Sequence, residues 1–70
     1  MVPLIYSNVG EDNVIKKVSG SPEVKKHLED LGFVPGTVVS LITTLDGNVI
    51  VNVKNVRIAI SKEMAQKIYI

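Results

Sequence analysis

Apolar and polar side chains alternate through three segments in the second half of the chain, at residues 37–43, 48–53 and 56–60. A period of two is typical of strands buried on one face, because successive side chains of a strand point to opposite sides. In each segment the face without serine, asparagine or arginine is the better candidate for the core. This choice predicts an inner face made of Val39, Leu41, Val49, Val51, Val53, Ile58 and Ile60.

Turn signals precede and separate these three segments. Asp46-Gly47 and Lys54-Asn55 each stand between two alternating segments, where residues that tolerate a left-handed backbone favour a tight hairpin. Pro35-Gly36 precedes the first segment and favours a type II turn, because proline presets φ at the second position and glycine supplies a positive φ at the third. The three segments are therefore predicted to form consecutive antiparallel strands.

One amphipathic helix is predicted at about residues 22–31. Ser21 can cap its first turn, and Pro22 suits the first helical position, where its missing N–H would have no partner. Gly32 can adopt the left-handed conformation that ends a helix. The apolar face of this helix consists of residues that follow each other at i, i+4 and i+7, which are Val24, Leu28 and Leu31.

Shorter elements complete the predicted chain. Residues 13–19 form a strand with Ile15 and Val18 as core candidates, Ser61 caps a short helical turn at about 62–66, and Ile68 to Ile70 form a last strand. Twelve valines, eight isoleucines and three threonines make up about a third of the chain and favour strands. Because about five short strands would leave exposed edges in a flat sheet, the sequence predicts a mostly β fold, a small closed antiparallel barrel with the helix at one end.

Length and charge exclude several classes of protein. A 70-residue chain forms a single domain, 1–70, and its net charge of +1 argues against nucleic acid as a partner. A nucleic-acid-binding barrel stays open as an alternative if six basic residues gather on one side: Lys16, Lys17, Lys25, Lys26, Lys54 and Arg57. The absence of cysteine fits a reducing compartment, and the apolar opening is too short for a secretion signal or a membrane span. We expect a cytoplasmic protein that does not insert into the membrane.

The inventory of reactive side chains is poor, and we expect no catalytic site and no cofactor. Gly32 and Gly36 lack the rest of a phosphate-binding loop, and both already have structural roles. Glu23, His27 and Asp30 lie at i, i+4 and i+7 on the predicted helix, where they form a weak candidate stripe for Fe(II) or Zn(II). A small metal sensor or carrier using this stripe is the alternative function, and a second chain would have to complete the site.

A surface for another protein is the function class that remains. The predicted contact is the loop between helix and strand, which combines an aromatic, a proline and a rigid turn: Leu31, Gly32, Phe33, Val34, Pro35 and Gly36. Four apolar residues assigned to outward positions can extend it: Val38, Ile42, Ile50 and Tyr69. The competing interpretation is that Phe33 closes the mouth of the barrel. Unpaired strand edges are compatible with a monomer or a weak or swapped dimer.

Several segments resemble those of a known family. The sequence Leu-Gly-Phe-Val-Pro-Gly at residues 31–36, Arg-Ile-Ala-Ile at 57–60 and Ala-Gln-Lys-Ile-Tyr-Ile at 65–70 are similar to the FeoA family of ferrous iron transport accessory proteins. The resemblance implies an SH3-like barrel, like the one that ends the metal-dependent repressors related to diphtheria toxin repressor. It also implies a non-enzymatic cytoplasmic adaptor that binds and regulates FeoB, the membrane permease with a GTP-hydrolysing domain. No iron-ligand motif carries over with it.

Overall fold

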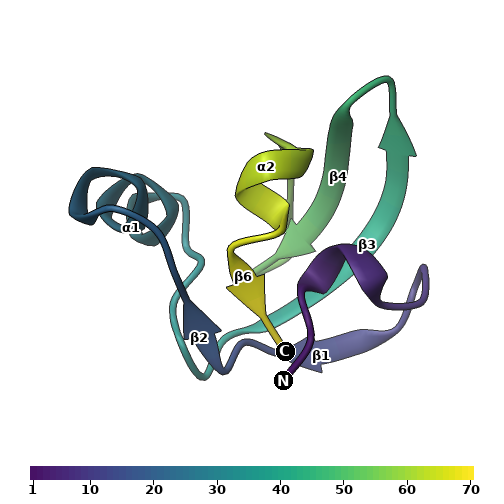
Figure 1. The fold of residues 1–70 in the computed structure, drawn as a ribbon. Coiled ribbons are helices and arrows are strands. Elements are labelled where there is room, and N and C mark those ends of the chain that lie inside the picture. Colours follow the sequence, from purple (N-terminus) through teal and green to yellow (C-terminus); the bar gives the residue numbers. More distant parts are fainter.

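A computed structural model describes residues 1–70 and contains six strands, two α-helices and one 3-10 turn. Figure 1 shows the chain from its amino terminus in purple to its carboxyl terminus in yellow. In chain order the elements are η1 (Leu4–Tyr6), β1 (Asp12–Val14), β2 (Lys17–Val18), α1 (Pro22–Asp30), β3 (Val38–Leu45), β4 (Asn48–Val53), β5 (Val56–Ser61), α2 (Lys62–Ala65) and β6 (Ile68–Tyr69). The predicted mostly β fold with one longer helix is confirmed.

The strands form two antiparallel sheets. One has four strands in the order β1-β3-β4-β5, and the other pairs β2 with β6. The closed barrel was a wrong expectation, because β1 and β5 do not pair and the larger sheet stays open at both edges. The predicted strand at 13–19 is also split in two. Ile15 donates its N–H to Thr37 while Lys16 donates to Tyr69, so the chain changes sheets between these residues.

The turns form where the sequence predicts them. Asp46 and Gly47 have φ of 37° and 86°, and Lys54 and Asn55 have φ of 52° and 63°. Left-handed backbone at both central residues gives two-residue turns whose twist matches that of antiparallel strands. The registers they set place Leu41 opposite Val51 and Val51 opposite Ile58. An irregularity between Leu41 and Thr43, which the alternation does not reveal, adds one residue to β3.

The helix α1 begins as predicted and ends at Asp30, one residue earlier than expected. The Ser21 side chain accepts a hydrogen bond from the N–H of Val24 at 3.3 Å, and Pro22 occupies the first turn. Leu28 is fully buried, whereas Val24 and Leu31 are half-buried against the core. Ser61 caps α2 in the same way, by accepting from the N–H of Met64 at 3.2 Å.

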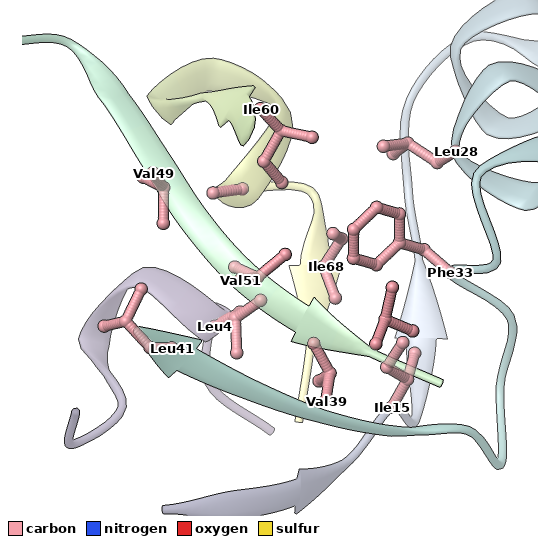
Figure 2. Close-up of a cluster of buried hydrophobic side chains, with 12 residues drawn as sticks. Leu4, Ile15, Leu28, Phe33, Val39, Leu41, Val49, Val51, Ile60 and Ile68 are labelled. Carbon is pink, nitrogen blue, oxygen red and sulfur yellow. The ribbon is translucent and has the colours of Figure 1, made fainter. Parts of the chain in front are cut away.

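A single apolar core joins both sheets and the two helices (Figure 2). Its twelve members are Leu4, Ile15, Leu28, Phe33, Val39, Leu41, Val49, Val51, Val53, Ile60, Ala65 and Ile68. Six of the seven residues predicted to face inward are among them, and Ile58 is half-buried. Leu4 comes from η1, which the sequence did not predict. The termini pair beside it, since Val2 and Ile70 exchange two backbone hydrogen bonds of 3.1 and 2.9 Å.

Candidate docking surface

The loop from Leu31 to Gly36 lies at the end of the four-stranded sheet where β1 ends and β3 begins, and only part of it is exposed. Phe33 is 1% exposed, and its ring points into the core near Leu28 and Ile68 (Figure 2). Its assignment to a contact surface is therefore corrected, because a buried ring offers no area to a partner. Leu31, Gly32 and Val34 are half-buried, whereas Pro35 and Gly36 are exposed.

The exposed part of the loop is a type II turn, as predicted. Thr37 donates its N–H to the carbonyl of Val34 at 3.1 Å, which closes the four-residue turn, and Gly36 has a φ of 92°. The N–H of Gly36 donates to the carbonyl of Ile15 at 2.8 Å. This bond fixes the turn beside the end of β1, so the turn presents a defined shape.

Two exposed valines lie next to this turn. Val14 is opposite Val38 in the pairing of β1 with β3, and they are 50% and 49% exposed. Opposite residues of an antiparallel pair project from the same face of a sheet. That face is the outer one, because the neighbouring Val39 is fully buried on the inner side. Together with Pro35 and Gly36 they form an apolar surface that we call the valine–turn surface.

The other apolar residues assigned outward contribute less. Ile42, Ile50 and Tyr69 are each half-buried, so Val38 is the one of the four that is largely exposed. Val14 was not predicted as part of the surface. Its exposure follows from alternation, because Ile15 points into the core and the preceding side chain therefore lies on the outer face.

A shallow polar depression of about 340 Å³ adjoins Val38 on the outer face. Its walls are Asp12, Val38, Ser40, Asn52, Lys54 and Asn55. The cross-strand register explains this grouping, because Asp12 pairs with Ser40 and Ser40 pairs with Asn52. Ser40 is 5% exposed and is the one buried polar residue. The valine–turn surface therefore has an apolar centre with a polar border, as protein contact surfaces commonly have.

A second open depression, of about 580 Å³, lies between the amino-terminal segment and α2. It is lined by Pro3, Tyr6, Glu63, Gln66, Lys67 and Tyr69. Tyr6 is 73% exposed, so its ring stands largely in solvent. Alternation and turn residues do not predict this feature, because it depends on the pairing of the two chain ends.

The helix stripe proposed for a metal ion does not assemble into a site. Glu23, His27 and Asp30 are all exposed, and no group of three or more acidic, histidine or cysteine side chains in the molecule is arranged to hold a metal ion. Metal binding by this stripe stays a prediction that would need ligands from another chain. Neither helix has the length and apolar character that crossing a bilayer requires.

Comparison with known proteins decides the family. The model of the FeoA domain matches residues 2–70. The chain belongs to the FeoA family. It is 30% identical over 70 residues to a Methanocaldococcus jannaschii protein that carries the name Fe(2+) transport protein A, covering 100% of this chain and 85% of that protein.

Solved FeoA structures have the same fold as this member of the FeoA family. A crystal structure of an iron uptake regulatory protein (FeoA) matches with a TM-score of 0.86 and 25% identity, over 96% of this chain and 91% of that chain. Iron(II) transport protein A from Clostridium thermocellum matches with a TM-score of 0.86 and 26% identity, over 99% of this chain and 43% of that chain. A manganese-dependent transcriptional repressor matches with a TM-score of 0.87 and 14% identity, over 97% of this chain and 39% of that chain. At this identity the likeness shows a shared fold alone.

Proposed function

We propose that this FeoA-family chain serves ferrous iron uptake as a cytoplasmic adaptor that binds and regulates the FeoB permease. Three observations support the proposal: the family itself, the iron transport names of its relatives, and the exposed valine–turn surface. The exposed pair of Val14 and Val38 is the observation that carries the docking role, because exposed apolar side chains beside a rigid turn favour contact with another protein.

Covering the two valines contributes to the affinity for a partner. Fully burying a valine contributes about 1.5–3 kcal/mol, so covering Val14 and Val38, which are each about half exposed, contributes about 1 kcal/mol each. The turn and the paired strands are already ordered by backbone hydrogen bonds, so little conformational entropy is lost on binding. These two side chains therefore supply only part of the affinity, because association itself costs about 4–15 kcal/mol.

The test is a binding assay on purified full-length FeoB in nanodiscs. The double variant Val14→Thr/Val38→Thr keeps the shape and strand preference of both side chains but adds a hydroxyl to each. We expect it to bind at least about tenfold more weakly, because a loss of about 1.4 kcal/mol corresponds to a factor of ten. Val9→Thr is the matched control, since Val9 is exposed outside the surface.

The outcomes separate the two parts of the proposal. If the double variant binds with unchanged affinity, the chain docks through another face of the molecule. If the wild-type chain does not bind the permease at all, the proposed adaptor function is wrong.

A further inference from the structure

The larger sheet has two free edges, β1 and β5, and both are open to solvent. Asp12 and Val14 on β1 and Arg57 and Ala59 on β5 are exposed. Unpaired backbone donors and acceptors on such an edge can add a further strand. In this chain the two free edges are complementary in their backbone groups and in their charge.

The backbone groups of both edges point outward at defined residues. Ile15 donates its N–H to Thr37, so by the two-residue alternation of an antiparallel pair the amides of Asp12 and Val14 point away from β3. On the opposite edge a two-residue turn joins Val53 to Val56, which makes these two the first hydrogen-bonded pair. The N–H and C=O groups of Arg57 therefore point away from β4.

The side chains of the two edges carry opposite charge. Asp12, Ser40, Asn52 and Arg57 occupy one row across the outer face of the sheet, with the carboxylate at one end and the guanidinium at the other. Glu11 precedes Asp12 and adds a second carboxylate beside the β1 edge. None of the side-chain hydrogen bonds in the molecule uses Asp12 or Arg57, so both are available.

We propose that the β5 edge of one copy binds the β1 edge of a second copy, head to tail. Strands alternate in direction along the order β1-β3-β4-β5, so a copy added in the same orientation presents its β1 antiparallel to β5. Arg57 then faces the partner's Asp12 across a hydrogen-bonded pair. Their side chains project from the same face of the continued sheet and form an ion pair.

This contact joins two different surfaces, so it is heterologous, and its repetition gives a ring or an open filament. β1 has three residues, which limits the pairing to a short strand and keeps the association weak. Because the ion pair is exposed, added salt screens it and weakens the assembly. The proposal concerns the chain by itself and does not depend on the adaptor function.

The test is analytical ultracentrifugation of the purified chain up to millimolar concentration, in low and in high salt. We expect the average mass of the wild type to rise with concentration in low salt and to fall toward the monomer in high salt. Arg57→Asp and Asp12→Arg each place like charges across the contact, and each should keep the chain monomeric. The double variant Arg57→Asp/Asp12→Arg restores opposite charges and should associate again.

Lys26→Asp is the matched control, because it reverses the charge of an exposed residue on α1 and should associate like the wild type. A wild type that stays monomeric throughout would overturn the proposal. So would single variants that associate normally, or a double variant as monomeric as the single ones. All three substituted positions, Asp12, Lys26 and Arg57, are exposed, and circular dichroism checks that each variant is folded.

Discussion

Replacing Phe33 should reduce stability rather than partner binding. The ring is 1% exposed and lies in the core, in a loop whose backbone is tied to α1 by the bond from the Phe33 N–H to the Leu28 carbonyl at 2.9 Å. Truncating a buried phenylalanine to alanine costs about 3–5 kcal/mol. A domain of 70 residues is stable by about 4–10 kcal/mol in total, so Phe33→Ala would remove a large part of the free energy of unfolding. The milder Phe33→Leu should cost about 1–2 kcal/mol and still fold.

Urea unfolding followed by far-ultraviolet circular dichroism measures this loss. With a slope of about 1 kcal/mol per M, Phe33→Leu should lower the midpoint by about 1–2 M. Val38→Thr is the control, because a half-exposed side chain should change stability by less than about 0.5 kcal/mol. Folded Phe33→Leu should bind the permease like the wild type. A variant with an unchanged midpoint and lost binding would show that Phe33 is a contact residue after all.

Two further changes test the turn and the helix stripe. Gly36→Val should destabilise the turn by about 1–2 kcal/mol in the same unfolding assay, since a branched residue must adopt a φ of 92° there. A Cβ added at Gly36 would meet no atom within 4 Å, so the loss of stability should come from the backbone conformation alone. A loss far above this range would contradict that explanation. For the stripe, we expect calorimetric titration with Fe(II) or Zn(II) to give the same result for His27→Ala as for the wild type. Affinity lost with His27 would favour the metal sensor or carrier instead.

The parts of the fold that were predictable are those specified by neighbours in the sequence. Alternation identified the inner residues of β4 because the face a side chain takes depends only on its position along one strand. Ser21 and Asp46-Gly47 are also local signals, since each satisfies or shapes the backbone within four residues. These features needed no knowledge of which strands pair.

The parts that were not predictable depend on pairing between distant segments. Leu4 is fully buried because the chain ends pair around it, and a single 3-10 turn carries no periodicity that reveals this. The sequence also could not decide whether Phe33 points in or out, since both interpretations fit a loop residue after Gly32. Val14 was missed for a different reason: alternation with Ile15 places its side chain outward, but only the pairing of β1 with β3 brings it opposite Val38.

Net charge likewise does not predict how charge is distributed over the surface. A sum of +1 argues against a dedicated nucleic-acid binder, and it suggests a surface without strong fields. The sheet nevertheless places Asp12 at one edge and Arg57 at the other, so the chain carries a charge asymmetry that cancels in the sum. Because β1 carries both Asp12 and Val14, a partner that covers the valine–turn surface also approaches the edge proposed for self-association. The two proposals together therefore predict that docking on the transporter and assembly of copies compete for β1.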